Sequence, residues 1–206
     1  MHIADGVLPL SVAAGCGAVS LALAAWSVRS TDGDDLPKVA VVTASFFVSS
    51  LIHVPLGPTS VHLLIPGLVG ILLGRSAFLS ILLGLLLQSL LFSFGGLTAL
   101  GANALMMGVP ALLSGLLFNR LRGTSHKQNM LIGALAGGSG TLLAATILAF
   151  LLASGGEDFF GVMKLAVLAH IPVFVIEALV SAFTVSFLYR VKPELLEQRL
   201  GVVCQG

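Results

Sequence analysis

The chain has little charge. Only 9% of its 206 residues are charged, against 57% that are apolar, and the mean hydropathy is +1.07. A soluble domain of this size could not cover its surface with so few charges. The apolar segments reach helical lengths and lack the alternating pattern of a membrane barrel. The composition therefore predicts an all-α membrane protein that forms one domain over residues 1–206.

Other features are scarce or missing. Of the two cysteines, Cys16 is in the first apolar segment and Cys204 is in the tail, so a disulfide is not expected. A net charge of +1 without a basic stripe gives no support for nucleic-acid binding. Neither a G-x-x-x-x-G-K-[ST] loop nor an H-E-x-x-H motif occurs. No basic region or small-residue cleavage site marks a signal peptide, so we expect Met1 to be the true terminus.

Apolar runs predict a seven-transmembrane-helix bundle with spans over residues 10–28, 38–54, 61–74, 77–94, 102–118, 130–153 and 159–189. The third span is short, because about 14 residues reach only about 21 Å of a core about 30 Å thick. We therefore expect the loop at 55–60 to dip into the protein and to place His62 at the start of the short helix, on the floor of an outward pocket.

Basic residues fix the predicted orientation. With the N-terminus outside, Lys164 alone lies on the outer half, and the other basic residues lie inside: Arg29, Lys38, Arg75, Arg120, Arg122, Lys127, Arg190, Lys192 and Arg199. This bias is typical of cytoplasmic loops. The terminal segment 1–9 would face outward, the bundle would span residues 10–190, and the tail 191–206 would be cytoplasmic.

The first two residues predict a metal chelate. The Met1 amine, the backbone nitrogen of His2 and its Nδ1 can close two adjacent rings around one ion. A planar nitrogen set suits Ni(II) or Cu(II) better than ions that prefer octahedral oxygen ligands. His62 is the best fourth ligand by position. The alternatives are that His2 only caps the N-terminal segment and that His62 only begins a helix.

Further polar residues have predicted places in this scheme. His53, Thr59, Ser60 and Asn103 would lie around the pocket and orient the ligands. Three polar residues within the spans would form a structural network, with a gating role for the glutamate as the alternative: Gln88, His170 and Glu177. His126, in a basic inner loop, is expected to be solvated.

Small residues predict close helix contacts. Residues 133–140 carry Gly133, Ala136, Gly137 and Gly140, which places their helix at the centre of the bundle. Ala14, Ala18 and Ala22 form a stripe on the first span. Its partner could lie within the chain or in another subunit, and we expect part of the contact with a coupling protein there.

Four stretches are familiar as a set: MHIADGVLP at the start, HVPLGPTSVHLLIPGLVGILLG at 53–74, LLLQSLLFSFGGLTALGANALMMG at 85–108 and AHIPVFVIEALVSAF at 169–183. They resemble, in register over nearly the whole chain, the CbiM/NikM family of substrate-capturing components of energy-coupling-factor transporters for cobalt and nickel. Where this chain has Met106 and Met107, the family often has other small residues.

The resemblance implies a six-helix core plus an extra N-terminal helix, with Ni²⁺ or Co²⁺ held in a near-square plane by Met1, His2 and His62. It also implies a prokaryotic inner-membrane location and no catalytic residues or cofactor. The implied partners are a transmembrane coupling protein, ATP-binding cassette ATPase subunits and a small accessory membrane subunit. Two rival hypotheses are a stand-alone divalent metal permease and an intramembrane metalloenzyme with zinc at His170 and Glu177.

Overall fold

The computed structural model describes residues 2–51, 53–56, 59–63, 65–156 and 160–197, with the backbone alone for 53–56 and 59–62. These ranges contain seven α-helices, two short paired β-strands and three short 3-10 helices, joined by turns and loops. The helices are α1 Leu10–Arg29, α2 Leu36–Ser49, α3 Pro66–Leu73, α4 Ala77–Phe92, α5 Leu100–Leu121, α6 His126–Ala153 and α7 Phe160–Val191. The predicted helical architecture is thus present.

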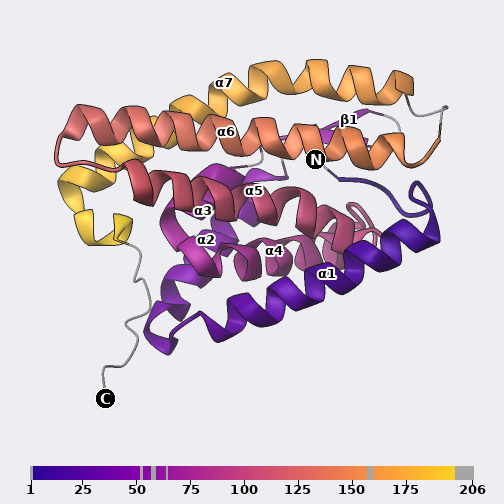
Figure 1. Cartoon of the computed structure of the whole chain (residues 1–206), viewed down its shortest axis with the longest axis horizontal. Coiled ribbons are helices and arrows are strands. Elements are labelled where there is room, and N and C mark those ends of the chain that lie inside the picture. The colour runs from indigo at the N-terminus through magenta and orange to yellow at the C-terminus, as the bar shows by residue number, and fades with distance from the viewer. Residues whose placement is uncertain (1, 52, 57–58, 64, 157–159, 198–206) are drawn as a thin grey trace.

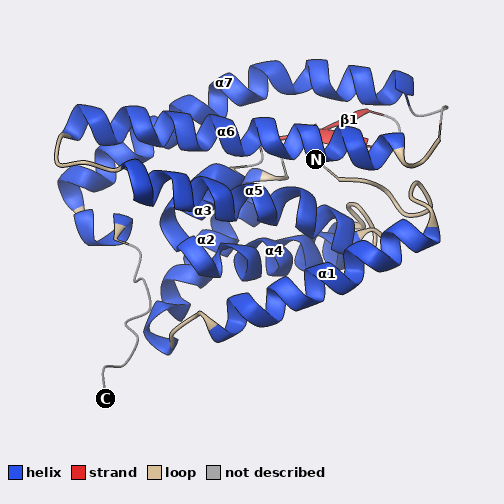
Figure 2. Cartoon of the chain, viewed as in Figure 1, coloured by secondary structure: helices blue, strands red, loops and turns tan. Residues whose placement is uncertain are grey.

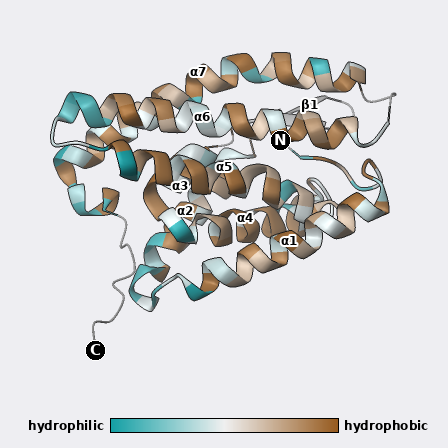
Figure 3. Ribbon diagram, viewed as in Figure 1, coloured by the Kyte–Doolittle hydropathy of each residue, from teal (hydrophilic) through white to brown (hydrophobic). Residues whose placement is uncertain are grey.

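The helices lie in layers (Figure 1). α6 and α7 pack along each other on one side, α3 and α5 lie between, and α1, α2 and α4 form the other side. Figure 2 shows that helix makes up almost the whole molecule. In Figure 3 hydrophobic colour covers the middles of the helices, and hydrophilic colour gathers mainly at the end that holds the α1–α2 and α5–α6 connections.

Among the described residues, five stretches are long and apolar enough to cross a membrane, which supports the predicted membrane protein. One of them, Pro66–Phe92, consists of α3 and α4 joined by the 3-10 turn η2, Gly74–Ser76. Gly74 breaks the helix there, with φ 56° and ψ −117°. α2 has 14 residues and α3 has eight, so the number of membrane crossings stays a prediction.

The segment around the two central histidines differs from the prediction. Residues 38–54 were expected to be one helix, but α2 ends at Ser49, and strand β1, His53–Leu56, pairs antiparallel with β2, Thr59–His62. His62 therefore ends a strand rather than beginning a helix. Pro55 and Pro58 account for this, because proline disfavours the helical conformation of itself and of the residue before it.

α6 is central, as its small residues predict. A Cβ added at Gly137 would lie 2.2 Å from the Ser181 hydroxyl of α7, and one added at Gly67 of α3 would lie 2.5 Å from the Gly137 Cα. Three helices thus meet at near backbone contact. α1 touches α5 in the same way, since a Cβ at Gly101 would lie 2.5 Å from the Gly17 Cα.

The alanine stripe on α1 does not make that contact. Ala14, Ala18 and Ala22 are exposed on the outer side of the helix. α1 instead turns Gly17, Ser20 and Ala24 inward. A contact of the stripe within the chain is therefore wrong for the described residues, and a contact with another subunit stays a prediction.

Candidate metal centre

The N-terminal segment is docked into the bundle by a buried asparagine. The Ile3 backbone N–H donates to Asn103 Oδ1 at 2.8 Å, and Asn103 Nδ2 donates to the Ile3 carbonyl at 3.0 Å. Ile3 is fully buried and Asn103 is 2% exposed. A primary amide that meets both backbone groups of one residue acts as a short piece of β-ladder. Asn103, on α5, thereby fixes the position and direction of the chain beside His2.

His2 is held by α4. Its Nε2 lies 2.7 Å from Gln88 Oε1, and both side chains are buried. With the amide oxygen as the acceptor, Nε2 carries the proton and Nδ1 is the acceptor nitrogen of the ring. The Phe94 ring lies 6.0 Å away, between centroids. The imidazole is therefore oriented, and this bonding pattern matches the tautomer that a chelate through Nδ1 requires.

A glycine pair makes room for the docked segment. Gly95 and Gly96 have φ values of +80° and +86°, which L side chains rarely adopt. A Cβ at Gly95 would lie 2.8 Å from Asn103 Nδ2 and 3.3 Å from the His2 side chain, and one at Gly96 would lie 2.1 Å from the Asp5 carboxyl group. The turn thus lies directly against the N-terminal segment.

Asp5 fastens the same segment to the start of α5. Its Oδ1 accepts hydrogen bonds from the Thr98 backbone N–H at 2.9 Å, from the Thr98 hydroxyl at 2.5 Å and from the Ala99 N–H at 3.2 Å. The Thr98 hydroxyl, together with these N–H groups, holds the pKa of Asp5 below its ordinary value of 3.8, against a smaller opposing effect of burial. A carboxylate here satisfies donors that the first turn of a helix leaves open.

The other residues predicted for the metal site lie wholly or in part outside the described structure. Met1 is outside the described residues, and so are the side chains of His53, Thr59, Ser60 and His62. The described backbone pairs His53 with His62 across the hairpin, and β2 packs on α7. No group of three His, Cys, Asp or Glu side chains that could hold a metal occurs among the described residues; the predicted set also uses backbone nitrogens.

The three membrane-embedded polar residues have different partners in the described part of the chain, and their common network stays a prediction. Gln88 bonds to His2. Glu177 of α7 accepts the Ile65 backbone N–H at 2.8 Å and the Thr141 hydroxyl. His170 Nδ1 donates to the Ala166 carbonyl at 2.6 Å, and its Nε2 is buried with no partner in the described part of the chain. Gln88 thus bonds to the N-terminal segment, whereas Glu177 bonds to the residue before α3.

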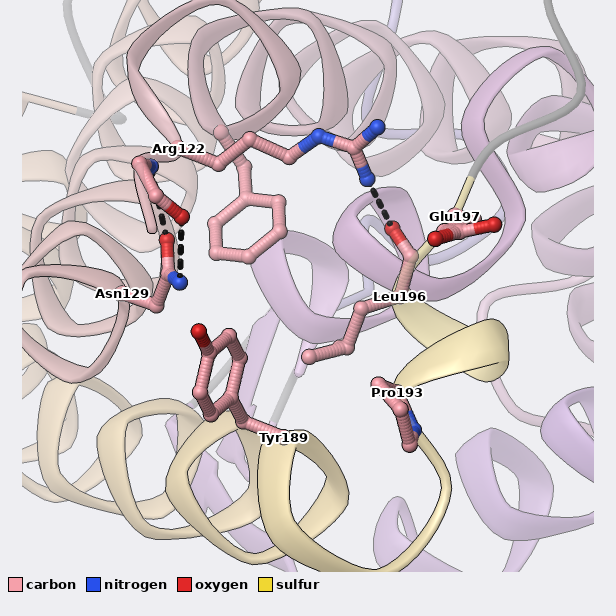
Figure 4. A pocket seen from close by; sticks show the side chains of 8 residues that line it. Arg122, Asn129, Tyr189, Pro193, Leu196 and Glu197 are labelled. Atoms are coloured by element: carbon pink, nitrogen blue, oxygen red, sulfur yellow. Dashed lines mark hydrogen bonds between the residues drawn. The ribbon is translucent and has the colours of Figure 1, made fainter. Parts of the chain in front are cut away.

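His126 is bonded rather than merely solvated. It begins α6, and its Nε2 accepts from the Ser186 hydroxyl at 2.9 Å and from Arg190 Nε at 3.1 Å. It lies at the end of the bundle opposite the His2 site. Figure 4 shows a pocket in that same region. There Arg122 Nη1 donates to the Leu196 carbonyl at 3.0 Å, so this bond holds Leu196 near the end of α5. Asn129 bonds to Gly123 within the α5–α6 connection.

Sequence reasoning missed the parts of the site that act through backbone. No role was predicted for Asp5, for Thr98 or for the turn at Gly95 and Gly96. The available signal was the pair of adjacent glycines, which permits a close approach of another chain segment. What approaches them is a segment about 90 positions away, which no local pattern encodes.

The chain is similar over nearly its whole length to known metal transport proteins. A family model described as "Cobalt uptake substrate-specific transmembrane region" (CbiM) matches residues 2–195. A "Putative metal transport protein" of Haemophilus influenzae is 35% identical over 96% of this chain and 98% of that protein. The "Cobalt transport protein CbiM" of Sorangium cellulosum is 32% identical, over 98% and 97% respectively.

The chain is also similar to a nickel transport protein and to a solved transporter structure. The "Fused nickel transport protein NikMN" of Rhodobacter capsulatus is 31% identical over 97% of this chain and 65% of that longer protein. A crystal structure of a transition metal transporter has a TM-score of 0.74 at 25% identity and covers 93% of each chain. With matches over nearly its whole length, the chain belongs to the CbiM family of substrate-specific membrane components of cobalt and nickel transport.

Proposed function

We propose that the chain captures Ni²⁺, or Co²⁺, at the outer face of the membrane and delivers it for ATP-driven uptake. The ligands are the Met1 amine, the His2 backbone nitrogen and Nδ1, and the His62 imidazole. The observation that carries this proposal is the bond from His2 Nε2 to Gln88, because it leaves Nδ1 as the nitrogen that can close the chelate.

The surrounding polar residues act as a second layer. Gln88 orients the His2 ring and Asn103 holds the backbone next to it. In this proposal His53, Thr59 and Ser60, which belong to strands β1 and β2, also orient the ligands. Outer residues of this kind typically contribute about 10–100-fold to metal affinity. Because the four donors are nitrogens that can lie in one plane, the site favours nickel over cobalt.

Uptake needs partners in this proposal. The bundle crosses the membrane seven times with its N-terminus outside, and it is the substrate-binding component of an energy-coupling-factor importer in a prokaryotic inner membrane. A transmembrane coupling protein and ATP-binding cassette subunits supply the energy, and a small accessory membrane subunit assists. The sequence itself has no phosphate-binding loop. The fused names of the nickel transport relatives support an assembly of several parts.

The test is calorimetric titration of the purified protein with Ni²⁺ and Co²⁺. Two variants are compared with the parent: one with a glycine inserted between Met1 and His2, which changes the chelate ring sizes, and His62→Ala. His126→Ala serves as a control, since this imidazole lies at the opposite end of the bundle. The proposal expects both test variants to lose tight binding and the control to keep it. Parent-like binding by both test variants would overturn the proposed ligand set.

A further inference from the structure

Glu177 lies at a junction that the proposed ligand set does not use. The residue is 1% exposed in the middle of α7. One carboxyl oxygen accepts the Ile65 N–H at 2.8 Å, and the other accepts the Thr141 hydroxyl of α6. A single carboxyl group therefore ties together α6, α7 and the residue that precedes α3.

Ile65 is an unusual residue to be held in this way. It is the N-cap of α3 and has a left-handed backbone, with φ 44° and ψ 28°. A branched residue adopts this conformation at a cost and keeps it only where the surroundings enforce it. The helix N-terminus also favours a negatively polarised group nearby. Glu177 supplies both the hydrogen-bond acceptor and the favourable polarity at the point where the chain turns into α3.

The junction has no spare room. As described for α6, Gly67 of α3 and Gly137 of α6 meet at backbone contact, and Gly137 lies against Ser181, one turn beyond Glu177. Because close-packed interiors shift as units rather than deforming smoothly, the start of α3 takes its position from α6 and α7.

The proposed ligand is only three residues from Ile65. At about 3.3–3.6 Å per residue, the His62 and Ile65 Cα atoms lie within about 11 Å of each other. β2, which His62 ends, packs on α7 (Figure 1). The hydrogen bond from Ile65 to Glu177 therefore fixes the chain three residues beyond the end of the strand that carries His62.

We infer that Glu177 is a positioning residue for the metal site, which fixes His62 through the Ile65 backbone and couples the site to α6 and α7. This inference rests on the proposed function, because it takes His62 as a ligand. It assigns the carboxyl group no contact with the metal.

The experiment measures Ni²⁺ affinity in the full-length protein for Glu177→Gln, for His62→Ala and for the double variant. A glutamine offers one acceptor oxygen in place of two, so if this oxygen keeps the bond from Ile65, an NH₂ group faces Thr141 and the Thr141 hydroxyl must turn toward the Gly137 carbonyl and accept instead of donate. We expect Glu177→Gln to lower affinity by about 10–100-fold. In the His62→Ala background the same change should cost nothing further, since residues that act as a unit are not additive.

Matched variants separate positioning from general weakening. Thr141→Val removes one bond to Glu177 without touching Ile65, and a smaller loss is expected. Thr43→Val removes the buried hydroxyl bond between α2 and α4, 2.8 Å from the Ser80 oxygen, and should lower the Tm but leave affinity unchanged. The visible d–d band of bound nickel should shift in Glu177→Gln toward that of His62→Ala, because both variants weaken the same ligand.

The possible outcomes are distinct. If His62→Ala binds like the parent, the proposed ligand set fails. If His62→Ala loses binding while Glu177→Gln binds like the parent, or if the loss from Glu177→Gln persists in full in the His62→Ala background, the positioning role alone is overturned. If Glu177→Gln does not fold, the Ni²⁺ affinities of Thr141→Val and Thr43→Val are compared instead. Equal Ni²⁺ affinities in these two variants would overturn the inference.

Discussion

His2 Nε2 lies 2.7 Å from Gln88 Oε1, although 86 positions separate the two residues in the chain. The contact fixes both the direction and the tautomer of an imidazole on a segment that has no regular structure of its own. Metal-binding histidines commonly bond through their second nitrogen in this way. The site thus depends on α4 as much as on the N-terminal residues.

Gln88→Leu should weaken Ni²⁺ binding by about 10–100-fold. The leucine keeps the volume but cannot accept the proton on Nε2, so the ring loses its preferred tautomer and orientation. Nitrogen-15 NMR of His2 in the metal-free protein should show the Nε2–H tautomer in the parent and a mixture in the variant. Gln128→Leu, on the exposed start of α6, is the control. Unchanged affinity in Gln88→Leu would refute the orienting role.

Asn103→Leu should release the N-terminal segment from α5. The variant leaves the buried N–H and C=O of Ile3 without partners, at about 1–3 kcal/mol for each group. We expect hydrogen exchange at the Ile3 amide to become fast and Ni²⁺ affinity to fall. Asn129→Leu is a close control, because Asn129 makes the same pair of bonds to Gly123 at the opposite end, at 2.9 and 2.8 Å. Equal losses of affinity in the two variants would contradict a local effect.

Gly96→Ala should impair docking more than its backbone strain alone explains. An alanine at positive φ costs about 1–2 kcal/mol wherever it occurs, but at Gly96 its Cβ would also meet the Asp5 carboxyl group. Gly156→Ala separates the two effects, since Gly156 has φ +115° and nothing within 4 Å of an added Cβ. Both variants should lose some thermal stability, and only Gly96→Ala should lose metal affinity. Parent-like affinity in Gly96→Ala would show that the turn tolerates the clash.

The helical, membrane-spanning character followed from composition, because long apolar runs can satisfy their backbone only as helices. The central place of α6 could be predicted from Gly133, Gly137 and Gly140, because small residues at these positions are what allows neighbouring helices to pack closely. The hairpin at 53–62 was not predicted, because its apolar residues suit a strand as well as a helix and the decision rested on Pro55 and Pro58.

The sequence suggests the chemistry of the candidate site more readily than its arrangement. The chelate proposed at Met1 and His2 is local, so two adjacent residues suffice to suggest it. The bonds of Gln88 to His2 and of Glu177 to Ile65 were not predicted, because both are polar residues in apolar helices and hydropathy does not show which neighbour each one faces. Asn103 and Asp5 each bond to main-chain atoms of a residue about 100 positions away. Every residue has such main-chain atoms, so the type of the partner residue does not reveal these bonds.

Two separate acid transitions are expected for the docked terminus. Because the pKa of Asp5 is lowered in the folded protein, its contribution to docking is complete above the ordinary value of 3.8 and is lost as the pH falls through the lower, folded value. The proposed amine and imidazole ligands must be deprotonated to bind, so metal affinity should fall as the pH falls. Metal should therefore leave before docking is lost, while the Thr98 amide signal that reports docking should persist until the pH is below 3.8.

Thr98→Val tests the cause of the lower transition. The Thr98 hydroxyl is the largest contribution to the lowered pKa of Asp5, so its removal should raise that pKa toward 3.8 and move the release of the segment to higher pH. Carbon-13 NMR of the Asp5 carboxyl group measures both. Thr98→Ser keeps a hydroxyl and should titrate like the parent. If Thr98→Val also titrates like the parent, the backbone N–H groups of Thr98 and Ala99 alone hold Asp5, and the hydroxyl has no part in docking.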